Sequence, residues 1–339
     1  MKLVRHDANP ILSPNPANAW ESFVTTNPGA WYDAASGQVQ MLYRAAGEEP
    51  EHRIYFGLAV SDDGYTFRRV SDEPVFGPSF DGFDAGCVED PRIIKIGGWY
   101  YVTYAARPFP PGQYWVHDPE KGYQKPVCPP EFPFSIASNV TATGLALTRD
   151  FKSWIRAGRL TDPSVDDRDV ILFPEKVGGR WAMMHRPMTW VGPEYGTEHP
   201  AMWVSRADDL LAWDSPRLLA KAELDWENQK IGGNTPPIRT PHGWLTLYHA
   251  VGTDRHYRLG AMLLDLDDPS VVRYRGRDWL LQPEAWYELE GPYQGVVFPC
   301  GKVVIGDTLF VYYGGADKYV GLATCSLSEL LDYLLACPA

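Results

Sequence analysis

The chain has 339 residues, of which 45% are apolar, and a formal net charge of −12, which argues against a nucleic-acid partner because phosphate backbones are bound by excess Lys and Arg. Its five cysteines form no C-x-x-C pair, so the sequence favours a reducing cytoplasm over a disulfide framework and offers no metal knuckle. No apolar stretch reaches the roughly 18 residues of a membrane span, and the N-terminal residues lack the apolar core of a signal peptide.

In chain order, five stretches share one plan, in which an apolar run and a proline are followed by a glycine-containing turn and an aromatic-rich strand. They cover residues 23–45, 86–106, 170–187, 230–250 and 295–315. A third apolar segment follows each stretch, as at 54–61 and 142–148. Repeats about 60–80 residues apart, with three or four strands each, are typical of propeller blades. A β-sandwich is the alternative, but it does not predict a fivefold motif. We therefore predict an all-β chain that forms one five-bladed β-propeller domain over residues 1–339.

Two segments depart from the repeat. Residues 107–139 interrupt the second blade and are rich in proline and aromatic residues; a loop this long is either functional or a surface excursion. As a lid, it would place Tyr114 and Trp115 over a binding site. Residues 326–336 have a serine at the start, a glutamate three residues later and leucines at helical spacing, which predicts a C-terminal helix. This helix would pack on a blade or on a second subunit, so a homo-oligomer stays open.

One position of the repeat, directly before its proline, should face the propeller axis and contribute to a central funnel. In chain order this position holds Asn27, Asp90, Phe173, Pro236 and Phe298. Asp90 alone is ionisable, which makes it the candidate general acid. Its neighbour Glu89 is expected to turn away from the cavity, because adjacent strand residues point to opposite faces.

A second position, at the end of each aromatic-rich strand, is polar in most blades. It holds Arg44 in the first blade, His185 and Arg186 in the third, His249 in the fourth and Asp317 in the fifth. A strand end usually needs only turn residues. Because charged groups recur at this position in several blades, they indicate a shared polar site. Arg168 and Lys230, just before the third and fourth blades, are expected near it.

The candidate anion-binding residues are Arg168, Arg186, Lys230 and His249. Gathering such cations around one point costs Coulomb repulsion unless an anion is bound. Arginine forks match phosphate oxygens and lysine adds a point charge, so we expect phosphate or a substrate carboxylate there. The alternative is that these residues form structural salt bridges with Glu175, Asp169 or Asp317.

Aromatic residues around a polar funnel suit a sugar, whose C–H faces stack on rings while its hydroxyls form hydrogen bonds. An inverting glycosidase uses two carboxylates, one as acid and one as the base that activates water. The sequence places only Asp90 in the cavity. The predicted site therefore has one acid and a group of cations.

These motifs together resemble glycoside hydrolase family 130. The matching segments, in order, are VEDPRI, LFPEK followed by HRP, KIGxxxPPI followed by GWLxxYH, YRLGA, VFPCG and YYGxAD followed by GLA. They run from about Asn27 to the C-terminal helix. The resemblance implies a five-bladed propeller. It also implies an inverting β-mannoside phosphorylase, the activity of most characterised members, whereas a minority are hydrolases.

The resemblance also implies roles for the candidate residues. Asp90 would be the general acid, protonating the glycosidic oxygen through the 3-hydroxyl of the bound mannose, while phosphate attacks the opposite face and releases α-mannose 1-phosphate. The phosphate ligands would be Arg168, Arg186, Lys230 and His249, and the sugar would be held by Asn27, Arg44, Asp317 and, as a weaker candidate, Tyr257. Phosphate is then a co-substrate, and neither a cofactor nor a metal is expected.

Two other functions stay open at this point. One is an inverting β-mannosidase that uses water, with Glu175 or Asp317 as base; the other is a non-catalytic sugar-binding propeller. The insertion at 107–139 is longer than in compact family members and is expected to shape the acceptor subsites. It leaves open the choice among β-1,2, β-1,3 and β-1,4 linkages.

Overall fold

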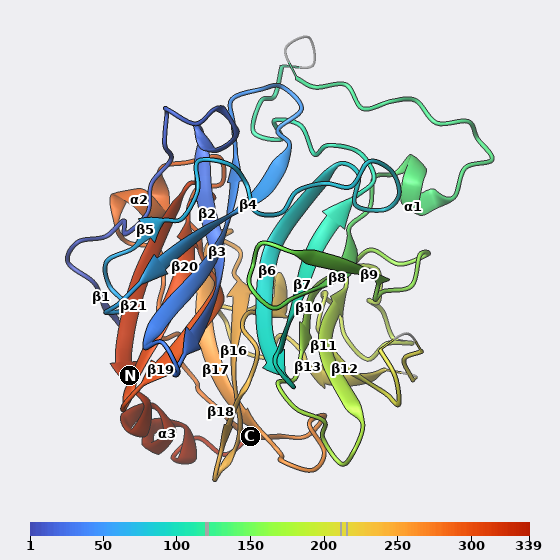
Figure 1. Cartoon of the computed structure of the whole chain (residues 1–339). Coiled ribbons are helices and arrows are strands. Elements are labelled where there is room, and N and C mark those ends of the chain that lie inside the picture. The colour runs from blue at the N-terminus through green and yellow to red at the C-terminus, as the bar shows by residue number, and fades with distance from the viewer. Residues whose placement is uncertain (119–121, 211, 215) are drawn as a thin grey trace.

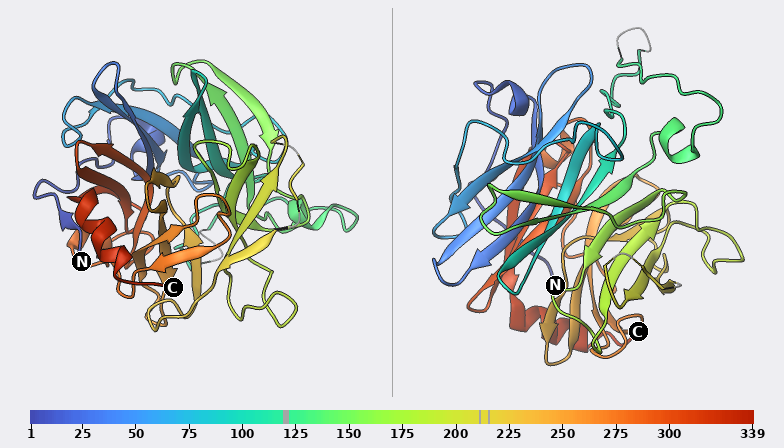
Figure 2. Two further views of the ribbon diagram at one scale, coloured as in Figure 1. Left: turned by 90° about the horizontal axis from the view of Figure 1, so that it is seen from below. Right: turned by 45° about the vertical axis from the view of Figure 1, so that its right-hand side comes forward.

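The computed structural model describes residues 1–118, 122–210, 212–214 and 216–339. Within these residues the strands form five antiparallel sheets, and the sheets radiate around one axis (Figures 1 and 2). The predicted five-bladed β-propeller is therefore confirmed. None of the helices in the described part of the chain is long and apolar enough to cross a membrane.

In the first four blades, the strands follow one another in chain order from the axis outward. The first blade contains β2 (Val24–Asp33), β3 (Gln38–Ala46), β4 (Ile54–Ser61) and β5 (Arg68–Arg69), and the second contains β6 (Cys87–Ile96), β7 (Trp99–Arg107), β8 (Ala142–Thr148) and β9 (Trp154–Arg159). The third contains β10 (Asp167–Leu172), β11 (Trp181–Pro187), β12 (Met202–Ala207) and β13 (Arg217–Ala220). The fourth contains β14 (Lys230–Gly233), β15 (Ile238–Thr240), β16 (Gly243–Val251), β17 (Tyr257–Leu264) and β18 (Val272–Arg275). The helical segments are η1 (Ala19–Glu21), α1 (Phe134–Ala137), α2 (Trp286–Leu289) and α3 (Leu327–Leu335).

The fifth blade is completed by the N-terminus. It contains β19 (Val297–Ile305), β20 (Thr308–Gly315) and β21 (Tyr319–Ser326), and its outer strand is β1 (Val4–Arg5), which pairs antiparallel with β21. Residues from the two ends of the chain thus share one sheet. This pairing closes the ring of blades, which the repeat pattern alone does not reveal.

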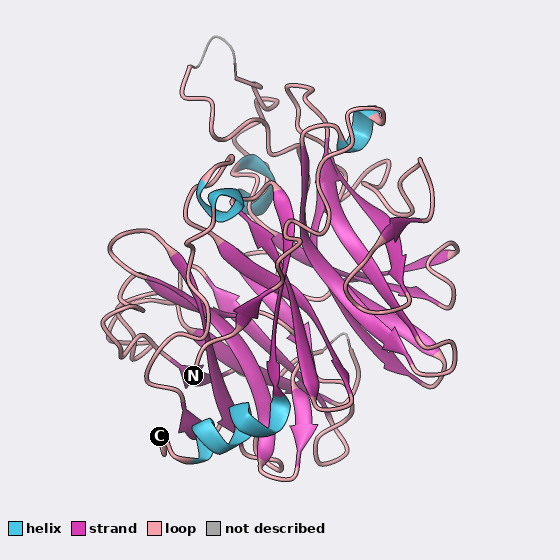
Figure 3. Cartoon of the chain, turned by 90° about the vertical axis from the view of Figure 1, so that its left-hand side faces the viewer, coloured by secondary structure: helices cyan, strands magenta, loops and turns pink. Residues whose placement is uncertain are grey.

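The C-terminal helix begins and ends within a residue of its predicted bounds. The Ser326 hydroxyl accepts a hydrogen bond from the Glu329 backbone N–H at 3.1 Å, as the sequence predicts for a helix cap. Leu330 and Leu334 are buried against the core of the fourth and fifth blades. The helix lies across one end of the strands (Figure 3). Of the two packing partners considered, a blade and a second subunit, the helix therefore contacts the blades.

Four blades of the described chain repeat one buried polar cluster, in which a tyrosine hydroxyl donates to a carboxylate that also pairs with an arginine. The clusters are Tyr43–Glu21–Arg69, Tyr104–Asp84–Arg156, Tyr248–Glu227–Arg275 and Tyr313–Glu288–Arg5. Each tyrosine ring lies over a glycine of the next strand, where a Cβ would overlap the ring. In the third blade, His185 takes this place and contacts Asp167 and Ser205. The clusters hold the outer strands to the middle ones.

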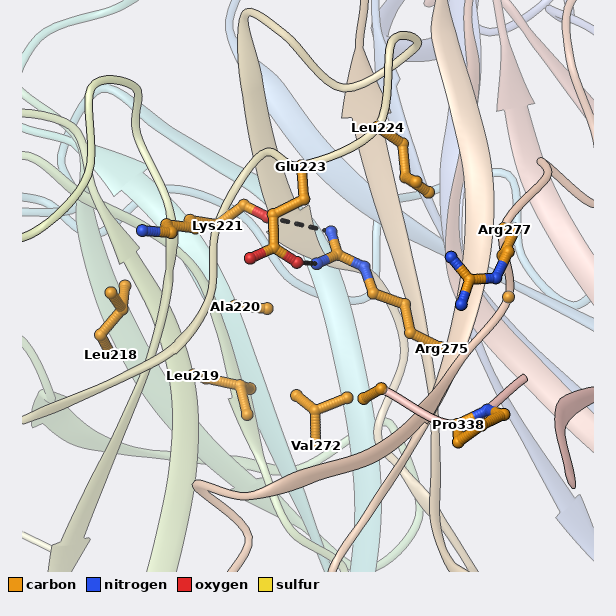
Figure 4. Close-up of a pocket in the computed structure, with 12 residues that line it drawn as sticks. Leu218, Leu219, Ala220, Lys221, Glu223, Leu224, Val272, Arg275, Arg277 and Pro338 are labelled. Atoms are coloured by element: carbon orange, nitrogen blue, oxygen red, sulfur yellow. Dashed lines mark hydrogen bonds and ion pairs between the residues drawn. The ribbon is translucent and has the colours of Figure 1, made fainter.

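We expect Glu227→Gln to lower the free energy of unfolding by about 3–5 kcal/mol, because it breaks a buried ion pair. Glu227 is fully buried, accepts from the Tyr248 hydroxyl at 2.7 Å and lies 2.7 Å from Arg275. The matched control is Glu223→Gln, which removes an exposed carboxylate 3.0 Å from the same arginine, at a surface cavity of about 400 Å³ (Figure 4). This exposed pair should contribute under about 1 kcal/mol. Urea unfolding followed by tryptophan fluorescence measures both, and equal losses would contradict the expectation.

The insertion at 107–139 has an anchored part and a projecting part. The Gly112 N–H donates to the Glu51 carbonyl at 2.9 Å, and the Gln113 side chain donates to the Glu48 carbonyl at 2.9 Å. Residues 112–115 therefore lie against the first blade. Beyond residue 122 the chain extends away from the blades and includes α1 (Figure 1). Among the described residues of the insertion, the anchored part is the one placed to act as a lid, since Tyr114 lines the pocket.

Candidate active site

Irregularities in three inner strands aim side chains at the propeller axis. The strand register shifts between Thr26 and Gly29 in β2, between Glu89 and Arg92 in β6, and between Arg168 and Ile171 in β10. Such bulges redirect side chains at the rims of sheets and next to active sites. At each shift one residue has a positive φ, namely Asn27 (44°), Asp90 (53°) and Asp169 (53°). Asn and Asp tolerate this left-handed conformation better than most residues, and all three line one pocket.

The third-blade counterpart of Asp90 is therefore Asp169, and the sequence-based choice of Phe173 is wrong. Aligning the blades on their prolines places Pro174 with Pro91, but Pro174 lies beyond the end of β10, whereas the bulge lies near that strand's beginning. Phe173 is buried in the core. Two carboxylates, rather than one, thus occupy equivalent bulge positions.

The pocket has a volume of about 270 Å³ and brings together most of the predicted site residues. Those that line it are Asn27, Arg44, Asp90, Tyr114, Arg168, Arg186, Lys230, Tyr257 and Asp317. Other residues that line it include Glu89, Arg107, Thr141, Asp169 and Tyr293, which sequence reasoning did not assign to the site, and Phe298, which the repeat placed at the axis. A polar stretch such as DDRD before a strand is the one signal that could have indicated Asp169.

Glu89 shares the pocket with Asp90, so the expectation that it turns away is wrong. The Arg44 Nη1 lies 3.2 Å from a carboxylate oxygen of each. The bulge and the positive φ of Asp90 break the strict alternation on which that expectation depended. Burial alone would raise the pKa of Glu89, but Arg44 and Arg107 lower it to about 2. Glu89 therefore stays ionised and does not act as a proton donor at neutral pH.

Asp90 is held on one side by the first blade. Its Oδ1 accepts a hydrogen bond from the Asn27 side-chain amide at 2.8 Å and from Arg44 Nη1 at 3.2 Å. The Tyr114 hydroxyl donates to Asp317 Oδ2 at 2.8 Å, which ties the insertion to the fifth blade. Burial raises the pKa of Asp317. These groups supply the pocket with hydrogen-bond donors and acceptors from neighbouring blades.

Trp115 lies outside the pocket, although the sequence suggested a sugar contact. Its ring stacks on Phe23 with centroids 5.2 Å apart and meets His52 edge-on at 4.8 Å. This packing fixes the insertion against the first blade. It thereby keeps the neighbouring Tyr114 in the pocket.

The cations of the third and fourth blades are only partly compensated. Arg168 donates to both oxygens of Asp166, at 2.8 and 2.9 Å, and Arg186 donates to Asp169 at 2.6 Å, so part of the structural salt-bridge alternative is correct. The Lys230 ammonium donates to the Tyr257 hydroxyl, and no carboxylate of the described residues pairs with it. Burial, together with the Arg186 guanidinium, lowers the pKa of Lys230 to about 7. An anion bound here would complete the charge balance.

His249 lies behind the pocket wall. Its Nδ1 is 2.7 Å from the Asn234 side-chain oxygen, and its Nε2 is 3.7 Å from Asp169 Oδ2. Its ring packs against Tyr257 and Phe298, with centroids 5.6 and 4.9 Å away. Burial lowers the pKa of His249 well below its usual value. His249 therefore does not line the pocket, and its contact with an anion stays a prediction.

A family model described as β-1,4-mannooligosaccharide phosphorylase matches residues 2–113 and 136–335. The chain belongs to glycoside hydrolase family 130. The internal stretch left unmatched, 114–135, falls within the insertion in the second blade of this family 130 protein.

Relatives of this family 130 chain align over nearly its whole length. It is 36% identical over 337 residues to a 1,2-β-oligomannan phosphorylase of Thermoanaerobacter sp. (strain X514), covering 97% of this chain and 99% of that protein. It is 35% identical over 339 residues to a β-1,4-mannooligosaccharide phosphorylase of Ruminococcus albus, covering 97% and 90%. Among solved structures, a β-1,2-mannobiose phosphorylase from Listeria innocua in complex with β-1,2-mannobiose has a TM-score of 0.79 at 26% identity, covering 99% and 100% of the two chains.

Proposed function

We propose that this family 130 protein is an inverting β-mannoside phosphorylase. It cleaves β-linked mannosides with inorganic phosphate and releases α-mannose 1-phosphate. The observation that carries the proposal is the pairing of a hydrogen-bonded acid, Asp90, with the undercompensated cations Arg186 and Lys230 in one pocket. Its relatives, which are named β-mannoside phosphorylases, agree with it.

The proposed mechanism follows from the geometry. Asp90 gives its proton, through the 3-hydroxyl of the bound mannose, to the leaving sugar oxygen, and a phosphate oxygen attacks the anomeric carbon from the opposite face, which inverts its configuration. Asn27 and Arg44 orient the acid, while Tyr114 and Asp317 offer hydrogen bonds to sugar hydroxyls. Arg168, Arg186 and Lys230 hold the phosphate and balance its negative charge beside the reacting carbon. His249 acts behind this layer, through Asp169 and Asn234.

Hydrolysis, the alternative to phosphorolysis, is not favoured. Glu175, one candidate base, forms an exposed ion pair with Arg239 at 3.0 Å and does not line the pocket. Asp317 lies in the pocket but is engaged by Tyr114. The relatives include phosphorylases of both β-1,2- and β-1,4-mannosides, so substrates of both linkages belong in the assay. We further propose a cytoplasmic site of action, consistent with free thiols on all five cysteines.

Omitting phosphate is expected to stop the cleavage of β-mannobiose. With phosphate present, phosphorus NMR should show mannose 1-phosphate, and proton NMR should show its α-anomer as the first product. Both β-1,2- and β-1,4-mannobiose are to be tested. Undiminished cleavage to free mannose without phosphate would establish a hydrolase instead. Sugar binding without turnover of any β-mannoside would establish a binding protein.

A further inference from the structure

The Asp169 carboxylate joins two arginines from different blades. Its Oδ2 lies 2.6 Å from both Nε and Nη2 of Arg186, on β11, and its Oδ1 lies 3.5 Å from Nη2 of Arg92, on β6. All three side chains are buried. Burial alone would raise the pKa of Asp169, but the surrounding cations hold it well below its usual range. The carboxylate is therefore a fixed negative charge between the acid side and the cation side of the pocket.

Arg92 carries this connection to the candidate acid. Its Nη1 donates to the backbone carbonyl of Asp90 at 2.9 Å, and its Nε donates to the carbonyl of Asn234 at 3.1 Å. The Asn234 side chain in turn contacts His249. One guanidinium thus fixes the left-handed backbone at Asp90 and a segment of the fourth blade at the same time.

Gly232 is an independent sign that this arrangement is tightly built. A Cβ at this position would lie 2.5 Å from Asp169 Oδ2, 2.6 Å from Arg186 Nε and 2.6 Å from His249 Cε1. Such distances are far below van der Waals contact, so only glycine lets these three groups meet here. The glycine in β14 is therefore required by the close packing of the charged groups beside it.

We propose that Asp169 is a positioning residue that couples the phosphate site to the general acid, an inference that rests on the proposed function. One oxygen sets the direction of the Arg186 guanidinium, and the other holds Arg92 beneath Asp90. Asp169 occupies the third-blade counterpart of the Asp90 position, so the same bulge supplies the acid in one blade and the anchor of the cations in the next. Each carboxylate oxygen thus serves one side of the pocket, so a change of one arginine should affect mainly its own side.

The role of Asp169 is tested by measuring phosphate binding to the Asp169→Asn variant by calorimetry. We expect inorganic phosphate to bind at least about tenfold more weakly, as for the loss of an interaction with a charged group. The KM for β-mannobiose should stay near the wild-type value. The matched control is Asp84→Asn, another buried aspartate paired with an arginine, which lies outside the pocket and should leave phosphate binding unchanged.

Two further variants separate positioning from stability. Gly232→Ala, which leaves every charge in place, should also weaken phosphate binding. Arg92→Lys keeps the charge but loses the fork, so it should lower kcat about tenfold or more while phosphate binding changes little. If these residues were purely structural, both variants would lower the melting temperature. Phosphate affinity would then not fall mainly in Gly232→Ala, nor kcat mainly in Arg92→Lys.

The inference is overturned if phosphate binds to Asp169→Asn within about twofold of wild type, or if Asp84→Asn loses as much affinity. If Asp169→Asn does not fold, Gly232→Ala decides in its place, and unchanged phosphate affinity there has the same meaning. If the wild-type protein binds phosphate but turns over no β-mannoside, the proposed function fails, while the calorimetric comparison still decides the role of Asp169.

Discussion

Asp90→Asn is expected to lower kcat for phosphorolysis of β-mannobiose by about 10²- to 10⁴-fold, the usual contribution of a general acid. Asparagine keeps the size of the side chain and can still accept the hydrogen bond from Asn27, so the pocket should keep its shape. What is lost is the proton for the leaving sugar. Initial rates of mannose 1-phosphate formation, at saturating phosphate, measure the effect.

Two comparisons make the Asp90 result specific. An aryl β-mannoside with a good leaving group needs little protonation, so the variant should lose much less activity with it than with β-mannobiose. Phosphate binding to the variant should stay close to wild type, because Arg186 and Lys230 are unchanged. A loss of less than about tenfold on β-mannobiose would exclude Asp90 as the acid.

The blades could be predicted from the sequence because each carries its own turn glycines, proline and aromatic strand. The closure of the ring could not. β1 (Val4–Arg5) is only two residues long, too short for an alternating pattern to show, and its partner β21 lies at the other end of the chain. Strand pairing over such a separation is fixed by the packing of the whole fold.

The site was predictable where a charged side chain occupies a recognisable position of the repeat, as for Asp90, Arg186 and Lys230. It was not predictable where backbone conformation decides the direction of a side chain. Strict alternation placed Glu89 outside the pocket, and alignment on prolines missed Asp169. Both errors have one physical cause, since a bulge with a positive φ shifts the register in a way that residue spacing does not record.

The bulges of the first three blades show how a repeated fold acquires an asymmetric site. Each places a short polar side chain at the axis in the same left-handed conformation. Asn27 donates to the acid, Asp90 is the candidate acid, and Asp169 is neutralised by cations. The charge neighbours differ, although the backbone geometry is shared. The position in the repeat thus sets the direction of each side chain, and the residues of neighbouring blades set its charge environment.

Lys230→Met should weaken phosphate binding by about 10- to 100-fold at pH 6, the expected loss for one charge-assisted hydrogen bond. Methionine fills the space of the lysine stem without its charge. Lys221→Met, which removes an exposed lysine at the surface cavity of Figure 4, is the control and should bind phosphate as wild type does.

The difference between wild type and Lys230→Met should shrink as pH rises. Because burial and Arg186 lower the pKa of Lys230 to about 7, the ammonium is charged at pH 6 and loses its proton in the free protein above pH 7. Bound phosphate favours the charged form, so binding above pH 7 requires uptake of a proton, and the wild-type advantage should fall by up to about tenfold per pH unit. Calorimetry from pH 6 to pH 9 gives the ratio of the two dissociation constants, in which the ionisation of phosphate itself cancels. A ratio that stays constant over this range would show that Lys230 does not titrate there or does not contact the anion.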